Sequence, residues 1–274
     1  MTVPSYSEIK RVLETAPILR SLGERLYERR FAGNCMGSFR GVFENFAEAR
    51  LSAPKTKSVG FNSAECAHQF VDRRSRVFSF DYPVIFWLQR LLQQGGTIFD
   101  LGGHVGIQFY AYHKYLKYPA GLNWMVCDLP EITKEGQALA QAQNEQSLSF
   151  TNRMEDADGA NILIAAGSLQ YIESPSLSGL LSKLEHKPHH LLINKVPLYD
   201  GDQFVTLQNG GAAFHPQYVF NRQEFIDSLT AIGYHLIDCW DVDTHPGYIP
   251  FHPEKSFPCH SGLYLALSTS PRRS

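Results

Sequence analysis

The feature of this chain that most constrains its fold is the segment 97–106, Thr-Ile-Phe-Asp-Leu-Gly-Gly-His-Val-Gly. A short apolar run ends in Asp100 and breaks into glycines before an amphipathic segment begins, which predicts a strand, a tight turn and a helix. Glycines at 102, 103 and 106 permit positive φ, and they let a ligand approach main-chain atoms without a Cβ in the way. The turn is therefore a candidate cofactor site.

The acid before the first glycine bears on the kind of cofactor. A dinucleotide fold places G-x-G-x-x-G in such a turn, with a pyrophosphate at the helix N-terminus. That register fails here, because Leu101 and His104 stand where the pattern needs glycine or tolerance of phosphate. Asp100 would also repel a pyrophosphate. A cationic cofactor suits the turn better, and an ordinary strand–helix turn without a ligand stays open as the alternative.

Length and charge limit the possible partners. The 274 residues, 43% of them hydrophobic, can bury one good core and an accessory segment. The formal net charge of −2 gives no electrostatic case for long nucleic acid or an anionic membrane, because both reward concentrated positive charge. We therefore expect a small-molecule substrate, with no nucleic acid and no membrane as partners.

Cysteine usage and hydropathy predict a cytoplasmic location. The five cysteines are an odd number without a C-x-x-C pair, and Cys127 and Cys239 lie in apolar runs typical of buried strands. They are interpreted as core thiols in a reducing compartment. No apolar stretch reaches the ~20 residues of a membrane span, and no signal-peptide hydrophobic region is found near the start.

The first 95 residues lack a repeated strand–helix alternation. They contain an amphipathic helical stretch around 7–30 and a Gly/Phe-rich piece at 37–43. A more apolar helix is predicted at 83–93, with Pro83 in its first turn. We expect a helical accessory or lid segment over 1–95 and the cofactor-binding domain over 96–274.

From residue 97 onward the pattern alternates between strands and helices. Strands are expected at 97–101, 123–128, 148–151, 161–166 and 189–195, and helices at 105–117, 130–142 and 174–184. Asn221, three residues before Glu224, predicts the start of a further helix that Gly233 ends. Two strands at 235–242 and 262–268 follow. Such alternation predicts an α/β fold whose mostly parallel sheet carries helices on both faces.

A second acid, Asp128, ends the second predicted parallel strand. In an open α/β sheet that end faces the ligand crevice. A carboxylate there can accept charge-assisted hydrogen bonds from both hydroxyls of a ribose. The alternative is that Asp128 only caps the helix that follows. Glu131 is better placed to serve the dipole of that helix.

The turn resembles motif I of the class I S-adenosylmethionine-dependent methyltransferases, Asp/Glu-x-Gly-x-Gly-x-Gly. Asp100, Gly102 and Gly106 match, and His104 replaces the middle glycine. The resemblance implies a Rossmann-like fold with a seven-stranded sheet whose last strand is antiparallel. It also implies S-adenosyl-L-methionine (SAM) as cofactor. SAM carries a cationic sulfonium and an amino group and no phosphate, so a carboxylate beside the turn is favourable.

The same resemblance implies a set of cofactor-binding residues at the ends of four strands. In the family, the segment after the third strand contacts the adenine, although a polar surface loop is an equal reading of 152–156 here. The turn after the fourth strand lies beneath the transferable methyl. The residues implied are Asp100, Gly102, Gly103, His104, Gly106, Asp128, Leu129, Met154, Glu155, Gly167, Ser168 and Gln170.

Longer segments are similar to a narrower set of predicted methyltransferases whose substrates are poorly defined. They are Gly37-Ser-Phe-x-x-Val-Phe, Ser168-Leu-Gln-Tyr-Ile172 and Val205-Thr-Leu-Gln208. This resemblance implies methyl transfer to a small-molecule acceptor. A hydroxyl is the favoured acceptor, with saccharides and secondary metabolites as candidate substrates.

Methyl transfer from a sulfonium is an in-line displacement that depends on positioning, and a base assists a hydroxyl acceptor. His215 is the first candidate base, in a polar stretch at 199–220 that we expect to be a loop closing over a substrate; a solvated loop histidine is the alternative. His104 is the second candidate. The spacing of His245, His252, Cys259 and His260 matches no zinc pattern, so no metal is expected.

Two other functions stay open at this point. One is an oxidoreductase with a nucleotide cofactor on the same sheet. The other is a non-catalytic protein that binds SAM and serves as a partner, since the sequence contains no unmistakable base. The oligomeric state is not predicted.

Overall fold

The computed structural model describes residues 17–92, 96–244 and 246–268, which form two compact units. The first unit contains the described residues up to Gly60 together with Phe204–Gln217 and Gly247–Ser256. The second contains Phe61–Gln203, Tyr218–Pro246 and the residues from Phe257 onward. Within these ranges, no helix is both long enough and apolar enough to span a membrane.

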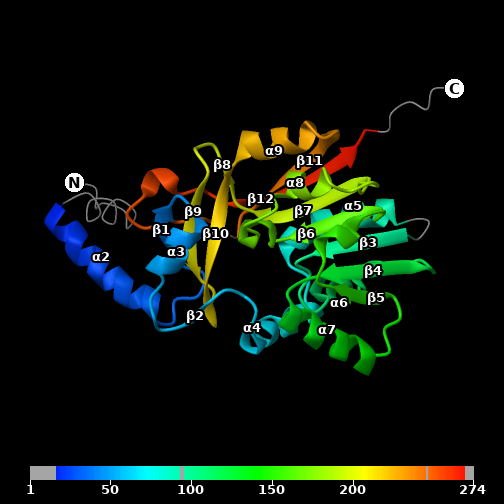
Figure 1. The fold of residues 1–274 in the computed structure, drawn as a ribbon, viewed down its shortest axis with the longest axis horizontal. Helices are drawn as coiled ribbons and strands as arrows, with labels where there is room; N and C mark the ends of the chain where they lie inside the picture. The colour runs from blue at the N-terminus through cyan, green and yellow to red at the C-terminus, as the bar shows by residue number, and fades with distance from the viewer. Residues whose placement is uncertain (1–16, 93–95, 245, 269–274) are drawn as a thin grey trace, which may run out of the picture. The chain divides into compact units, whose positions relative to one another are not determined.

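The second unit is built on a seven-stranded sheet with the order β11-β12-β7-β6-β3-β4-β5 (Figure 1). The strands are β3 (Gly96–Leu101), β4 (Leu122–Cys127), β5 (Leu148–Thr151), β6 (Ile162–Ala166), β7 (His190–Val196), β11 (Tyr234–Val242) and β12 (His260–Leu267). Strands β3 to β7 pair in parallel, and β12 is antiparallel to both β7 and β11. This confirms the Rossmann-like class I methyltransferase fold, including the antiparallel last strand.

Helices cover both faces of this sheet. Successive side chains of a strand point to opposite faces, so they pack against different helices. Leu163 and Leu191 lie in one buried cluster with α8 and α9, whereas Ile164 and Leu192 lie in another with α5 and α6. The helices of this unit are α4 (Ala64–Gln69), α5 (Tyr82–Leu91), α6 (Ile107–Tyr112), α7 (Pro130–Ala142), α8 (Leu177–Leu181) and α9 (Arg222–Thr230). The central strands are therefore apolar on both sides, as a parallel sheet requires.

Local signals set several helix boundaries. Asn221 Oδ1 accepts from the Glu224 N–H at 2.9 Å, so α9 begins at Arg222 as predicted. Gly233 follows the helix with φ +103°. Helix α8 is shorter than the predicted 174–184, because Ser176 caps it by accepting from the Gly179 N–H at 3.1 Å. Helix α6 is likewise shorter than the predicted 105–117.

The first unit contains a smaller sheet with the order β1-β9-β10-β2. Its elements are α2 (Pro17–Ala32), β1 (Phe39–Phe43), α3 (Phe46–Ser52), β2 (Ser58–Val59), β9 (Phe204–Asn209) and β10 (Ala213–Asn221), which leaves the unit after Gln217. The core includes Phe31 and Phe214, whose stacked rings are 5.2 Å apart. Helix α2 overlaps the predicted helical stretch at 7–30 and ends two residues beyond it; the start of that stretch, at 7–16, is outside the described residues.

The prediction of a loop at 199–220 is wrong. This stretch contains the end of β8 (Leu198–Tyr199), all of β9 and most of β10. Two of its polar side chains, those of Thr206 and Asn209, are buried and bonded to backbone, which the sequence pattern does not reveal. Thr206 Oγ1 donates to the Gly41 carbonyl at 2.8 Å, and Asn209 Nδ2 donates to the Phe31 carbonyl at 2.7 Å. A segment rich in polar residues indicates a loop only if those residues are exposed to water. Buried polar residues that are hydrogen-bonded can equally lie on strands.

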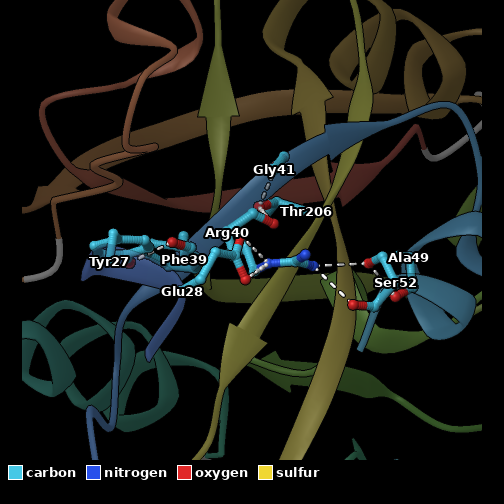
Figure 2. Close-up of polar contacts among 8 residues, drawn as sticks. All are labelled: Tyr27, Glu28, Phe39, Arg40, Gly41, Ala49, Ser52 and Thr206. Carbon is cyan, nitrogen blue, oxygen red and sulfur yellow. Dashed lines mark hydrogen bonds and ion pairs between the residues drawn. The ribbon is translucent and has the colours of Figure 1, made fainter. Parts of the chain in front are cut away.

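Arg40 on β1 joins three elements of the first unit, as Figure 2 shows. Its Nε donates to Glu28 of α2 at 2.7 Å and 2.8 Å, one distance to each carboxylate oxygen. Its Nη1 donates to the Ser52 carbonyl at 2.9 Å and to the Ser52 hydroxyl at 3.0 Å. Close by, the Tyr27 hydroxyl donates to the Phe39 carbonyl at 2.6 Å. The guanidinium therefore holds the end of α3 and the side of α2 to the sheet.

The cysteines are all free thiols. Cys127 is buried at the end of β4, as predicted. The prediction of a buried Cys239 is wrong, because it lies exposed on the edge strand β11.

Replacing Arg40 with Met is expected to lower the free energy of unfolding by about 1–2 kcal/mol, since the Ser52 carbonyl loses a charged donor. Urea unfolding measures this loss. The control is Lys55→Met, because Lys55 is exposed on the same unit. Equal stability of the two variants would contradict a structural role for Arg40.

Candidate functional site

The turn after β3 has the backbone conformation that its glycines predict. Gly102 has φ +75° and Gly106 has φ +88°. His104, which stands where the motif has its middle glycine, has φ +58°, a left-handed conformation that glycine adopts readily. The Gly102 N–H donates to the Cys127 carbonyl at 2.7 Å, which joins the turn to the end of β4.

Two of the glycines are also required by close packing. A Cβ built on Gly103 would lie 2.4 Å from Asp100 Oδ2, and one on Gly102 would lie 2.2 Å from the Cβ of Ser168. Ser168 approaches from the turn after β6, and its hydroxyl donates to the Leu101 carbonyl. The backbone of the turn is thus pressed against the ends of β3 and β6, without room for side chains.

Asp100 is a fully buried carboxyl at the end of β3. Trp124 Nε1 donates to its Oδ2 at 3.0 Å, while its Oδ1 has no partner among the described residues. Burial raises the pKa of Asp100 to about 7; the Trp124 hydrogen bond opposes this and the nearby Asp128 adds to it. Because buried polar atoms normally have partners, the open oxygen is a place where a ligand can donate a hydrogen bond.

Asp128 follows β4 and closes onto the same turn. Its Oδ2 accepts from the His104 N–H at 2.9 Å, and its Oδ1 accepts from the Leu129 N–H at 2.7 Å. The alternative that Asp128 only caps the next helix is wrong, because Leu129 occupies the N-cap of α7 and no side chain caps it there. The Glu131 N–H in the first turn of α7 donates to Asn62 Oδ1 instead, at 3.2 Å. Burial raises the pKa of Asp128, and the two backbone donors counteract it.

The turn after β6 completes this end of the sheet. Gly167 has φ +81°, and Ser168 reaches Leu101 as described above. Gln170, in η4 (Leu169–Tyr171), is 4% exposed; its Nε2 lies 3.5 Å from the Lys195 carbonyl, and its Oε1 has no partner in the described ranges. These residues meet Asp100 and Asp128 at the carboxyl ends of β3, β4 and β6.

The remaining predicted cofactor residues lie at the outer side of this region. Leu129 is exposed, and so is Glu155 in η3 (Met154–Ala157). Met154 is half-buried and packs against the cluster that contains Leu101. Met154 also lines a cavity of about 240 Å³, together with Leu101, Leu169, Ile172, Leu177 and Phe225.

His104 is held by α4 as well as by its own turn. Its Nε2 lies 3.1 Å from the Cys66 carbonyl, so that nitrogen carries the hydrogen, because a carbonyl can only accept. Its Nδ1 is buried and has no partner among the residues described. Burial lowers the pKa of His104. The side chain is therefore a neutral imidazole with one lone pair available.

His215 lies in β10 of the first unit and is 1% exposed, so the predicted solvated or lid-forming loop does not exist there. Burial lowers the pKa of His215 to about 3. A group with so low a pKa is a weak general base near neutral pH. The histidines of the Pro-rich connection do not lie in one unit. His260 is buried in β12 of the second unit, and His252 belongs to the first unit. His245 is outside the described residues.

Sequence reasoning missed three charged residues of the second unit. Lys195 lies near the end of β7 with φ +55°, Arg73 lies in η1 (Val71–Ser75), and Asp81 ends η2 (Ser79–Asp81). Asp81 is 5% exposed; it accepts from the Phe78 N–H at 2.9 Å and from the Tyr112 hydroxyl at 3.1 Å. Only Lys195 carried a usable signal, because it ends the fifth predicted parallel strand.

Comparisons with known proteins add structural neighbours only. No family model matches the chain, and no curated protein matches it. The chain is similar to the 1,6-didemethyltoxoflavin-N1-methyltransferase of Burkholderia thailandensis, which was crystallised with 1,6-didemethyltoxoflavin and S-adenosylhomocysteine (SAH). The identity is 15% over 74% of this chain and 82% of that one, and the TM-score is 0.49. The magnesium protoporphyrin IX methyltransferase of Synechocystis PCC 6803 with bound SAH has 14% identity over 74% of this chain and 96% of that one, with a TM-score of 0.47.

A SAM-dependent methyltransferase of Aquifex aeolicus has 14% identity over 75% of this chain and 99% of that one, with a TM-score of 0.48. At these values the neighbours say nothing about the reaction or substrate of this chain. The fold assignment rests on the chain's own strand order, and the narrower family resemblance stays a prediction.

The raised pKa of Asp100 predicts a pH-dependent stability. The folded protein binds this proton more tightly than the unfolded chain, whose aspartate has a pKa of ~4. Stability from this group is therefore greatest below pH ~4 and falls as pH rises toward about 7, by at most about 1.4 kcal/mol per pH unit. Urea unfolding of wild type and Asp100→Asn across this window measures the difference; parallel pH profiles would contradict the prediction.

Replacing Gly103 with Ala is expected to destabilise the protein by about 1–3 kcal/mol, because the new methyl would overlap the Asp100 carboxyl and displace it from Trp124. Gly33→Ala is the control, since a Cβ there meets its nearest atom at 3.5 Å, an ordinary contact. Thermal unfolding compares the two. Similar melting temperatures would show that the turn is not closely packed.

Proposed function

We propose that this protein is a SAM-dependent methyltransferase that acts on a small-molecule acceptor, with a hydroxyl as the favoured acceptor atom. One arrangement carries the proposal. Two carboxyls at the ends of the neighbouring strands β3 and β4 lie on either side of a turn in which residues 102, 104 and 106 all have positive φ. The acids beside this turn favour a cation over a phosphate.

The residues fit the cofactor group by group. The open oxygen of Asp100 would accept from the amino group of SAM, and a positive charge there would stabilise the ionised carboxyl. Asp128 would accept from the ribose hydroxyls, since each of its oxygens has a further lone pair beyond its backbone donor. Half-buried Met154 offers an apolar surface for the adenine.

When bound, SAM supplies a methyl group on a sulfonium, which is activated without help from the protein. The contribution of the chain is placement, for which effective-molarity arguments allow ~7–11 kcal/mol. The turn at 167–170 would form the floor under the reacting atoms, with Gly167 allowing close approach. The acceptor proton requires a base, which typically adds ~10²–10⁴-fold.

His104 supports the role of base better than His215 does. Its tautomer is fixed by the Cys66 carbonyl, so that Nδ1 presents a lone pair at the cofactor turn. Burial keeps it neutral by lowering its pKa. His215 is buried in the first unit with a pKa of about 3.

Titration calorimetry with SAM and SAH tests the proposal. Wild type is expected to bind both, and Asp128→Ala is expected to weaken binding at least ~10-fold, since charge-assisted hydrogen bonds are worth about 1.5–3 kcal/mol. Asp202→Ala is the matched control, because Asp202 is exposed on the same unit. Binding of NAD(P) without SAM would contradict the proposal and favour an oxidoreductase.

Transfer is then assayed with labelled SAM and a panel of hydroxyl-bearing saccharides and aromatic alcohols. Labelled product that disappears in Asp128→Ala supports the enzyme. Tight binding of SAM with no transfer to any panel member would favour a non-catalytic SAM-binding protein instead.

A further inference from the structure

We propose that the cavity lined by Leu101, Leu169 and Phe225 binds the methyl acceptor, and that this acceptor is a flat, largely apolar ring without a negative charge. The inference rests on the proposed function, which identifies the ligand as an acceptor, and it narrows the chemical class of that acceptor. Every residue that lines the cavity belongs to the second unit, so the site is built within one compact part of the chain.

The cavity lies beside the turn that would hold the cofactor. Leu101 lines it from the end of β3, directly before Gly102, and Leu169 lines it from η4, directly after Ser168. The Ser168 hydroxyl donates to the Leu101 carbonyl, and Gly102 lies too close to Ser168 to carry a Cβ. Met154, the surface proposed for the adenine, lines the same cavity. A ligand in the cavity would therefore be a neighbour of the bound cofactor.

Aromatic side chains form a further part of the lining. It includes Tyr218 and Phe220 from β10 and Phe225 from α9, and α9 lies beside α8, which contributes as well (Figure 1). The ring centres of Tyr218 and Phe220 are 5.4 Å apart, and those of Phe220 and Phe225 are 5.2 Å apart. The three rings thus make a continuous surface. Another flat ring can pack against such a surface in offset or edge-on geometry.

Two serine hydroxyls of the lining already have backbone partners. The Ser228 hydroxyl donates to the Phe225 carbonyl at 2.8 Å, and the Ser176 hydroxyl accepts from the Gly179 N–H at 3.1 Å. A saccharide in the cavity would need a partner for each of its hydroxyls, because an unpaired buried hydroxyl costs free energy. A ring with a single hydroxyl avoids most of that cost. The lining therefore favours an aromatic alcohol over a free saccharide.

The charged side chains of the lining are acidic. Glu173 and Glu224 are exposed, and among the described residues that line the cavity none is Lys, Arg or His. Tyr218 is neutral, because burial raises its pKa and the charge of Glu173 adds to this. An anionic ligand would thus approach two carboxylates and find no cation in the lining. This arrangement disfavours an acceptor that carries a carboxylate or a phosphate.

The volume of the cavity, about 240 Å³, limits the size of the ligand. An apolar protein cavity of about 150 Å³ binds benzene, so this cavity has room for two fused rings or one substituted ring. The exposed side chains of Gln203, Glu173 and Glu224 in its lining show that it opens to solvent. A ligand can therefore enter without unfolding of the chain.

Calorimetry on the full chain tests the inference with 2-naphthol, 2-naphthoate and glucose, each titrated with and without saturating SAH. Wild type is expected to bind 2-naphthol in both conditions, to bind 2-naphthoate ~3-fold or more weakly, and not to bind glucose. Glu224→Gln removes one carboxylate and is expected to strengthen 2-naphthoate binding ~2-fold while 2-naphthol is unaffected. Asp243→Asn is its control, because Asp243 is exposed on the same unit and does not line the cavity.

Ser228→Phe places a ring inside the cavity and is expected to weaken 2-naphthol ~10-fold or more and SAH less than ~2-fold. Thermal unfolding verifies that the variant folds. Ser178→Phe fills the same cavity from α8, and it repeats the test if Ser228→Phe does not fold. Ser182→Phe is the control, because Ser182 is exposed on the same unit and outside the lining.

The inference is overturned if 2-naphthol does not bind, or if the variants that fill the cavity match Ser182→Phe. It is also overturned if glucose or 2-naphthoate binds as tightly as 2-naphthol. Exclusion of 2-naphthol by SAH, or an equal loss of both ligands in Ser228→Phe, would assign the cavity to the cofactor and contradict an acceptor site. A wild type that binds 2-naphthol in this cavity but neither SAM nor SAH would refute the proposed function alone.

Discussion

The burial of the Asp100 carboxyl at the end of β3 is the constraint on which the site depends. The Trp124 indole holds one of its oxygens, and Gly103 lies so close to it that no side chain fits there. Because the next turn must pass over this carboxyl, it takes left-handed conformations at 102, 104 and 106. The position of His104, and with it the bond from its N–H to Asp128, follows from that path.

The same sheet edge explains why distant segments meet. Parallel strands bring their carboxyl ends to one side, so Asp100, Asp128, Gly167 and Lys195 converge although nearly a hundred positions separate the first from the last. The charges they bring are of both signs. Carboxyls lie at the ends of β3 and β4, and the cation Lys195 lies near the end of β7. A zwitterionic ligand would match that division, and the proposed cofactor has such a group.

Much of the second unit could be predicted from sequence, because its central strands are buried on both faces and its helices have local start signals. The range of α7 and the cap at Asn221 are examples. The first unit could not, since β9 and β10 carry polar residues such as Thr206 and His215 inside the fold, and the partner of Thr206, the Gly41 carbonyl, lies on a distant segment. At the site, motif I and Asp128 were predictable. Arg73 and Asp81 were not, because only packing brings η1 and η2 to the sheet edge.

The most direct test of the central claim is the proton balance of SAM binding, measured by calorimetry near neutral pH in buffers of different ionisation enthalpy. If a cation binds against Asp100, whose pKa is about 7 in the free protein, the carboxyl loses its proton and the observed heat varies with the buffer. The account predicts net proton release that is absent in Asp100→Asn. Binding with the same heat in every buffer would contradict it.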